Sequence, residues 1–216
     1  MYKRQLYNIV DRIYIGHIPG SGSLALTGVG VCLPIIMVVS AFAALVGSGG
    51  APRASIFMGK DDMDSAEKIL SGCFTVQIII SAILTAVLLL FGRSMLLTFG
   101  ASENTIGYAV DYMSIYAVGT IFVQMTLGMN MFITAQGFSK TSMLTVTIGA
   151  VCNIILDPIF IFGLDLGISG AALATALSQC ISFGILFFQS LLRKDCVHLK
   201  PGKITLSLSL YGEILH

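Results

Sequence analysis

The stretch Gly149–Gln179, GAVCNIILDPIFIFGLDLGISGAALATALSQ, places an asparagine and an aspartate inside an otherwise apolar run. Asn153 and Asp157 are one helical turn apart, so both side chains lie on the same face of a helix. A carboxylate is energetically expensive in hydrocarbon, and such groups usually face the interior of a helix bundle and serve a function. The pair therefore predicts a functional site inside a membrane-embedded bundle.

Pro158 follows the aspartate directly. Proline has no backbone N–H and clashes with the carbonyl four residues earlier, which here belongs to Ile154. We therefore expect the helix to be bent or loosened beside Asp157, with Pro158 as its hinge.

The composition indicates a membrane protein. The chain has 216 residues, of which 56% are hydrophobic and 11% are charged, and its mean hydropathy is +0.90. A soluble domain carries about 25% charged residues. The net charge of +1, without a basic stripe interleaved with aromatic residues, predicts no nucleic-acid partner. The five cysteines occur singly and predict neither a disulfide framework nor a CxxC metal site.

Six apolar segments predict an all-α membrane protein with six transmembrane helices, since a span needs about 20 apolar residues. The segments are Leu6–Ile18, Leu24–Ala51, Ile69–Phe91, Tyr108–Ala135, Ser142–Phe162 and Ile168–Leu192. The first is short and looks like the second half of a span whose start is truncated. Residues 1–192 would then form a six-helix lobe, and residues 193–216 a cytoplasmic linker.

The connections between these segments are read from their charges and turn residues. Arg53–Lys68, with mixed charge, and Gly92–Thr105 are predicted to be loops. Gly137–Lys140 reads as a short break and Gly163–Gly167 as a tight loop.

The distribution of Lys and Arg predicts the orientation, because these residues concentrate on the cytoplasmic side of short loops. With the amino end in the cytoplasm, only Arg93 and Arg12 fall on the outer side. The inner side holds Lys3, Arg4, Arg53, Lys60, Lys68, Lys140, Arg193, Lys194, Lys200 and Lys203. We therefore expect a multi-pass protein of the cell membrane with both termini in the cytoplasm.

Polar residues of four predicted helices fall at similar depth in the outer half of the membrane. At about 1.5 Å per residue, Asp11, Tyr112, Asp157 and Thr175 lie roughly 6–10 Å from the outer helix ends, and Asn153 lies one turn deeper. Oxygen-rich sites of this kind suit hard cations. Neighbouring carboxylates also raise each other's pKa and can hold a proton. The layer is thus a candidate cation or proton site.

Two further polar residues lie deeper in the fourth segment, Gln124 and Asn130. Both are candidates for lining a cavity, although packing inside the bundle explains them equally well.

Three stretches resemble the MATE (multidrug and toxic compound extrusion) family of secondary transporters, and most closely its bacterial and archaeal DinF-like branch. They are YNIVDRIYIGH at Tyr7–His17, LVGSGGAPRASIFMGKDD at Leu45–Asp62 and CNIILDPIFIFGLDLGISGAALATALSQ at Cys152–Gln179. The resemblance implies a six-helix lobe, one of two in a twelve-helix transporter, packed around a central substrate cavity. Since the chain has six spans, we expect it to be the amino-terminal lobe and its partner to be a missing carboxy-terminal lobe.

The resemblance also implies a function. The amino-terminal lobe of that branch has a cation or proton site, whose residues fall here on Asp11, Tyr112, Asn153, Asp157 and Thr175. The coupling ion would be Na⁺ or H⁺, with Na⁺ held at Asp11, Asn153 and Asp157, and no other metal or cofactor is expected. The implied activity is antiport that exports drugs or other cationic or amphipathic organic compounds. Arg12 departs from this picture as a bulky cation beside the site, and it can reach outward toward the membrane interface.

Several alternatives stay open at this point. Asn153 and Asp157 could be polar contacts that hold helices together. A lipid-linked oligosaccharide flippase of related architecture would be expected to have cationic residues in its cavity, which these spans lack. A membrane fragment without transport activity is a third reading. An intramembrane aspartyl protease is disfavoured, because no paired catalytic motif surrounds Asp11 or Asp157, and we expect no enzyme.

Overall fold

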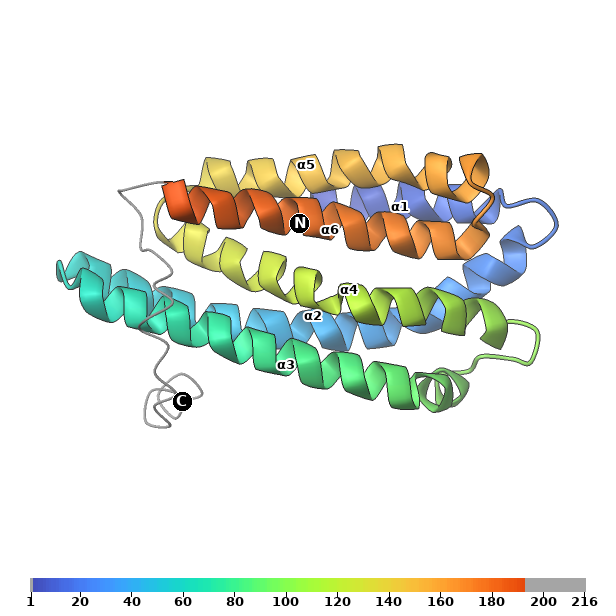
Figure 1. Ribbon diagram of the computed structural model, residues 1–216, viewed down its shortest axis with the longest axis horizontal. Helices are drawn as coiled ribbons and strands as arrows, with labels where there is room; N and C mark the ends of the chain where they lie inside the picture. The colour runs from blue at the N-terminus through green and yellow to red at the C-terminus, as the bar shows by residue number, and fades with distance from the viewer. Residues whose placement is uncertain (1, 193–216) are drawn as a thin grey trace.

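The computed structural model describes residues 2–192, with the side chains of residues 9–190, as an all-helical bundle (Figure 1). Its elements are α1 (Tyr2–Gly16), α2 (Gly22–Gly59), α3 (Met63–Thr98), α4 (Ile106–Ala135), α5 (Ser139–Pro158), the π-helical turn η1 (Ile159–Gly163) and α6 (Gly167–Leu192). The predicted fold class, with six helices in this order, is confirmed. The predicted linker 193–216 lies outside the described residues.

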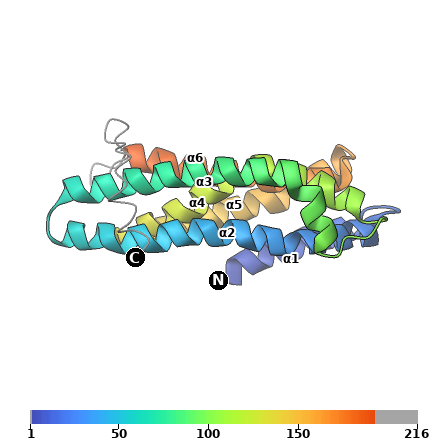
Figure 2. The same ribbon diagram turned by 90° about the horizontal axis from the view of Figure 1, so that it is seen from below.

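The described helices differ in whether they can cross a membrane. Five segments, the helices α2, α3, α4 and α6 and the continuous stretch of α5 with η1, are long and apolar enough to do so. The helix α1 has 15 residues, fewer than the roughly 20 that a span needs. Its first residues lie beside the middle of the bundle, not at an end (Figure 2).

The prediction that Arg53–Lys68 forms a mixed-charge loop is wrong. Helix α2 continues to Gly59 and α3 begins at Met63, so three residues connect them, and Asp61 has a positive φ of 64°. In the sequence, the charged residues favour a loop over this stretch. Arg, Lys, Glu and Ala are, however, good helix formers, so the helices can continue past the apolar segments into water. With 38 residues, α2 is about 57 Å long, well beyond a hydrocarbon core of about 30 Å.

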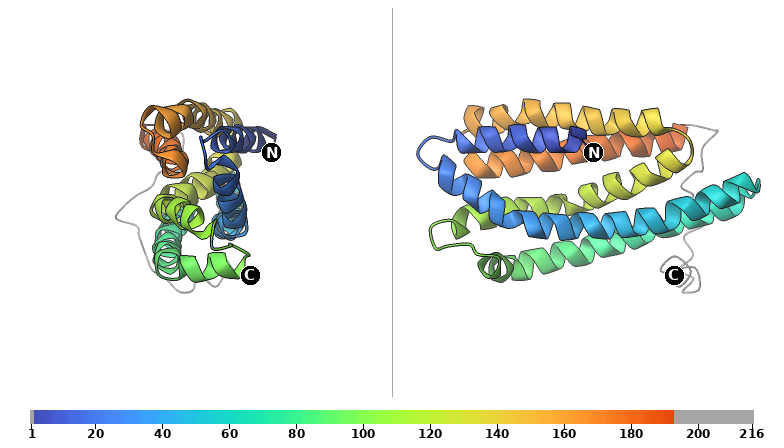
Figure 3. Two further views of the ribbon diagram at one scale, coloured as in Figure 1. Left: turned by 90° about the vertical axis from the view of Figure 1, so that its right-hand side faces the viewer. Right: turned by 180° about the vertical axis from the view of Figure 1, so that it is seen from behind.

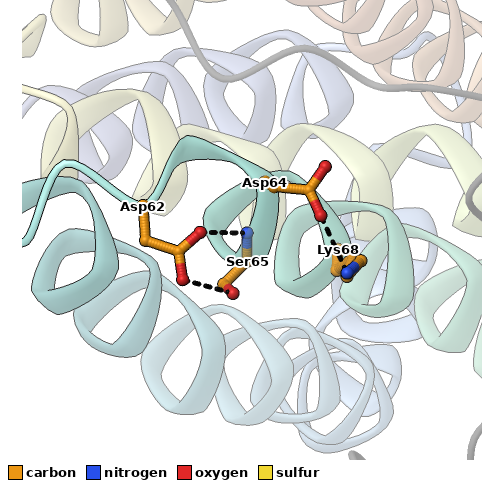
Figure 4. Close-up of polar contacts among 4 residues, drawn as sticks. All are labelled: Asp62, Asp64, Ser65 and Lys68. Carbon is orange, nitrogen blue, oxygen red and sulfur yellow. Dashed lines mark hydrogen bonds and ion pairs between the residues drawn. The ribbon is translucent and has the colours of Figure 1, made fainter.

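The start of α3 has a side-chain cap (Figure 4). Asp62 Oδ1 accepts a hydrogen bond from the backbone N–H of Ser65 at 3.1 Å, and its Oδ2 accepts one from Ser65 Oγ at 2.7 Å. These two bonds lower the pKa of the Asp62 carboxyl, which lies outside the apolar spans. Asp64 pairs with Lys68, which lies one turn further along α3, at 2.8 Å. Local polar contacts thus fix the sharp reversal between two long helices.

The other connections are also shorter or shifted relative to prediction. Helix α3 reaches Thr98, so only the second half of the predicted loop Gly92–Thr105 is a connection. The break near Gly137 ends before Ser139, where α5 starts. Gly163 belongs to η1 and not to the tight loop. In each case the helix extends past the apolar run that defined it in the sequence.

The helices pack as two groups that share α4. Helix α2 packs against α3 and α4, while α6 packs against α4 and α5, and α1 lies against α5 (Figures 1 and 3). We call the end with the α2–α3 and α4–α5 turns the basic end, because Lys60 and Lys140 lie there.

Two buried glutamines tie α3 and α4 to α2. Gln124 Nε2 donates to the carbonyl of Val39 at 2.7 Å, and Gln77 Nε2 donates to that of Ala43, one turn further, at 3.5 Å. Gly128 makes room for Gln77, because a Cβ there would overlap the Gln77 amide. These two bonds thereby help to fix the spacing of α2, α3 and α4.

Candidate cation site and adjoining cavities

The buried face of α5 is polar. Its buried residues are Thr145, Gly149, Asn153 and Asp157, each four residues after the last, and none of them is apolar. Residues four apart stack on one face of a helix. Directly after Pro158 the helix widens into η1, where the N–H of Leu164 bonds to the carbonyl of Ile159 at 2.9 Å. The irregularity therefore lies beside Asp157, and π-turns often mark functional sites.

Asn153 links α5 to α6. Its Nδ2 donates to Asp157 Oδ1 at 3.1 Å and to Thr175 Oγ1 at 3.4 Å. Asp157 is 0% exposed and Asn153 is 2% exposed. A carboxyl group thus lies inside the bundle, with one of its oxygens held by an amide.

Asp11 and Tyr112 approach the same place from α1 and α4. Together with Thr175 they line a cavity of about 290 Å³. Tyr112 shares a side-chain hydrogen bond with Thr175, and the Asp11 carboxyl acts electrostatically on both Tyr112 and Asp157. The Tyr112 ring stacks on Tyr116 with centroids 6.4 Å apart. The structure therefore brings all five predicted site residues together from four helices.

Three buried oxygens of this cluster lack a hydrogen-bond partner. They are Asp11 Oδ1, Asn153 Oδ1 and Asp157 Oδ2. A buried polar atom without a partner is costly, and in native proteins it usually indicates an ion or water that completes the site. Carboxylate and amide oxygens are ligands that hard cations prefer. The donor set therefore fits Na⁺, and a proton on either carboxyl would also satisfy it.

Arg12 lines the same 290 Å³ cavity as Asp11. Its side chain is exposed, and its positive charge acts on the Asp11 carboxyl. Arg12 thus lies at the exposed edge of this cavity, beside the Asp11 carboxylate.

A larger cavity of about 810 Å³ opens on α2, α4 and α5 toward the basic end. Asn130 lines it, whereas Gln124 is fully buried in its bond to Val39. The two cavities meet at Ser40 and Leu127, which line both.

The lining of the larger cavity carries no charged side chain and is rich in small and hydroxyl residues. Its α2 wall includes Ser40, Ala44, Ser48, Ala51 and Ser55. Sequence reasoning missed these serines. The available signal was that serines and alanines alternate at spacings of three and four residues along α2, which places small residues on one helical face.

The five helical segments that can cross a membrane make this the fold of a membrane protein, and comparison with known proteins gives its family. The MatE family model matches residues 4–159. The chain belongs to the MatE family of transporters.

Curated relatives include multidrug exporters. The chain is 32% identical over 203 residues to the multidrug export protein MepA of Staphylococcus haemolyticus, which covers 92% of this chain and 44% of that relative. It is 26% identical over 183 residues to an FAD transporter of Shewanella oneidensis, covering 83% of this chain and 40% of the relative. The chain thus spans less than half of each of these relatives.

Solved structures show the same half-length match. An inward-facing multidrug resistance MATE transporter of the MOP superfamily superimposes with a TM-score of 0.90 at 26% identity, covering 97% of this chain and 47% of that one. A MOP superfamily transporter from Pyrococcus furiosus gives a TM-score of 0.89 at 25% identity, covering 47% of its length. This coverage is consistent with one lobe, the amino-terminal one, of a two-lobe transporter.

Proposed function

We propose that this chain is the coupling lobe of a cation-driven antiporter. The ion, Na⁺ or H⁺, binds among Asp11, Tyr112, Asn153, Asp157 and Thr175. The observation that carries the proposal is the buried Asn153–Asp157 pair with its unpaired oxygens, together with Asp11, whose carboxyl also has an unpaired oxygen and acts electrostatically on Asp157. Two carboxyl groups distinguish this cluster from the glutamine tethers, whose buried amide oxygens also lack partners but carry no charge.

Ion binding would act by changing the charge of the layer. Two ionised carboxyls in a low-dielectric interior repel each other, and a bound Na⁺ or proton relieves that repulsion. A ligand shifts a two-state equilibrium only by binding one state more tightly. We infer that the neutralised layer favours one packing of α5 against α1 and that Pro158 with η1 absorbs the change.

The transported molecule would be a small cationic or amphipathic organic compound. Relatives carry the name multidrug export protein, and the 810 Å³ cavity falls within the size range of small-molecule sites. Its apolar and hydroxyl lining suits ligands with an apolar body. A lipid-linked oligosaccharide, with its phosphates, matches an uncharged lining poorly.

The concentration of Lys and Arg at the basic end suggests how the chain is oriented in the membrane. We infer that this end faces the cytoplasm of the cell membrane, which places both termini inside. Transport would also require a second, carboxy-terminal lobe, because the 810 Å³ cavity opens on one side of this lobe.

Ion binding can be tested on the 216-residue chain in lipid nanodiscs. Thermal unfolding is followed in NaCl and in choline chloride at several pH values. A bound ion at 100 times its Kd stabilises the folded state by about 2.7 kcal/mol. We expect Na⁺ or acid to raise Tm, and Asp157→Asn to abolish the shift. Asp165→Asn, in the exposed loop after η1, is the matched control and keeps the shift.

Transport is tested by joining the chain to the carboxy-terminal half of the S. haemolyticus relative. Ion-gradient-driven efflux of a fluorescent organic cation from liposomes should depend on Asp157. Efflux that persists at the wild-type rate in Asp157→Asn would show that the carboxyl only packs helices.

A further inference from the structure

The hydroxyl groups on the α2 wall of the 810 Å³ cavity have their protons engaged by the backbone. Ser48 Oγ donates to the Leu45 carbonyl at 3.3 Å. Ser55 Oγ donates to the Ala51 carbonyl at 3.1 Å and lies 3.3 Å from the Ala135 carbonyl of α4. A hydroxyl has one proton and two lone pairs, so these two groups can only accept a further hydrogen bond.

The α4 wall of the cavity is similar. Thr134 Oγ1 donates to the Asn130 carbonyl at 2.8 Å, and Asn130 Nδ2 donates to the Thr126 carbonyl at 2.9 Å. The hydroxyls of Ser40 and Ser142 complete the polar lining, and each can donate or accept. Together with the second N–H of Asn130, these are the donors that the lining keeps. Its other polar side chains meet a ligand as acceptors.

Pro52 adds a backbone acceptor to the α2 wall. Proline has no N–H, so the Ser48 carbonyl, four residues earlier, lacks the donor that an α-helix ordinarily supplies to it. Ser48 and Pro52 both line the cavity, and residues four apart share one helical face. The carbonyl between them therefore lies on the cavity face. Backbone carbonyls are strong acceptors that require a donor, and a ligand in the cavity can supply one.

Positive charge lies beside the cavity but not in its lining. Arg53 follows Pro52 in the chain, Lys140 precedes Ser142 by two residues, and neither side chain lines the cavity. No carboxylate lines it either. A cationic ligand therefore gains little from charge attraction at this wall, and its recognition depends on the hydrogen bonds that it can donate.

We propose that the large cavity selects its ligands by their N–H donors, and that the Ser48 carbonyl left free by Pro52 is the main acceptor. The favoured class is amphipathic amines, amidines and guanidines in their protonated forms. Their N–H groups bond to the α2 wall while the apolar body lies against Ala44 and Leu127. The inference rests on the export function proposed above and specifies which cations the cavity prefers.

Quaternary ammonium compounds are the disfavoured class. They carry the same charge as a protonated amine but no N–H, so they cover the acceptors of the α2 wall without bonding to them. Leaving such a group unpaired is costly. A site built to hydrogen-bond a ligand therefore discriminates against an analogue that lacks the donor.

Binding to the 216-residue chain in lipid nanodiscs tests this selection, with empty nanodiscs as the measure of partition into lipid. The probes are naphthylmethylammonium and its N-trimethylated analogue. Both carry one positive charge on the same fluorescent aromatic body at neutral pH. The two probes differ in hydration, so the informative quantity is how a substitution changes the ratio of their two Kd values.

Pro52→Ala restores the missing N–H, which then occupies the Ser48 carbonyl. We expect the Kd of naphthylmethylammonium to rise about tenfold, because hydrogen bonds that involve a charged group are strong. The Kd of the trimethylated probe should stay the same. Pro34→Ala is the matched control, since Pro34 also lies inside α2 but lines neither of the two cavities. It should leave both Kd values unchanged.

A second variant leaves the backbone as it is. Ser48→Ala removes the Oγ acceptor and should weaken the binding of naphthylmethylammonium alone. An unchanged Kd ratio in Pro52→Ala would overturn the inference and leave the export function standing. Equal losses for both probes in Pro52→Ala would also contradict it, because the proline would then only shape the cavity.

A failure of the cavity itself would look different. If neither probe binds the chain above the lipid background, the cavity is no substrate site, and the inference fails together with the proposed substrate class. The ion-dependent Tm shift described above tests the cation site separately, so the two failures can be told apart.

Discussion

Asn153 Nδ2 lies 3.1 Å from Asp157 Oδ1, one turn along α5, and the same nitrogen lies 3.4 Å from Thr175 Oγ1 on α6. A single amide thus orients the carboxyl and joins it to the neighbouring helix. Because the nitrogen makes both bonds, the amide oxygen points elsewhere and has no hydrogen-bond partner. The carboxyl and the amide act as one unit.

Replacing Asn153 by alanine should weaken ion binding without abolishing it. The change removes one oxygen ligand and the donor that orients Asp157. A hydrogen bond to a charged group contributes about 1.5–3 kcal/mol, which corresponds to roughly 10–100-fold in Kd. Titrating the ion-dependent Tm shift measures the effect. Cys152→Ala, the neighbouring position on α5, serves as control and should bind normally; equal affinity in both variants would contradict the role of Asn153.

Asp11→Asn and Asp157→Asn should not be additive. Each change alone removes the paired carboxyls, so the double variant should bind the ion about as poorly as the worse single variant. A double-mutant cycle on ion-dependent unfolding gives the coupling free energy. Two independent, summed losses would mean that the carboxyls belong to separate sites.

Gly128→Ala should destabilise the fold, because the added methyl overlaps the buried Gln77 amide. Overpacking of this kind costs about 1–3 kcal/mol. Gly30 on α2 has nothing within 4 Å of a Cβ and is exposed, so Gly30→Ala should be neutral or slightly stabilising. Chemical unfolding in mixed micelles compares the two. If both alanines behave alike, Gln77 does not hold the α2–α3–α4 spacing.

The cap on α3 should depend on pH. Hydrogen bonds from Ser65 lower the pKa of Asp62 in the folded chain, so the ionised carboxyl stabilises the helix start above the ordinary aspartate pKa of about 3.9. This contribution is lost as the pH falls through the lower folded value. Amide exchange at the first turn of α3 should therefore quicken in acid. Asp62→Asn keeps an acceptor and should show a cap without that dependence; the same acid response in Asp62→Asn would trace it to another group.

Thiol labelling in intact cells should distinguish the two ends of the bundle. In a chain whose native cysteines are replaced by alanine, a cysteine at Glu103 should react with an impermeant reagent, and one at Lys60 should react only after the cells are opened. The reason is the concentration of Lys and Arg at the basic end. The reverse pattern would invert the proposed orientation.

The apolar runs and the layer of polar residues could be predicted because each rests on a local rule. Six apolar segments predict six helices, and counting residues from the helix ends places Asp11 and Asp157 at a similar depth, although it does not show that they face each other. Helix ends were predicted less well. Residues 53–68 include many charged side chains. Such residues indicate where the apolar part of the membrane ends, but a helix can continue beyond that point.

The close approach of Gly149 to Ser182 and the glutamine tethers of Gln77 and Gln124 could not be predicted in the same way. Gly149 and Ser182 come from different helices, and the space they share depends on how closely α5 and α6 approach. From the sequence, Gln124 could equally line a cavity or pack inside the bundle. The structure shows that it packs, because its Nε2 donates to the Val39 carbonyl on α2. Which residues of two helices contact each other depends on how far each helix is rotated about its own axis. The spacing of the apolar residues does not determine that rotation closely enough.

The meeting of the two cavities at Ser40 and Leu127 has a consequence for how such a lobe can diversify. The carboxyls lie on one side of this boundary, and the serines of α2 lie on the other. Substitutions at Ser48 or Ser55 would reshape what the large cavity accommodates while the spacing of Asp11, Asn153 and Asp157 stays unchanged. Under the proposed function, selection for new substrates and selection for ion coupling would therefore act on separate residues of this bundle.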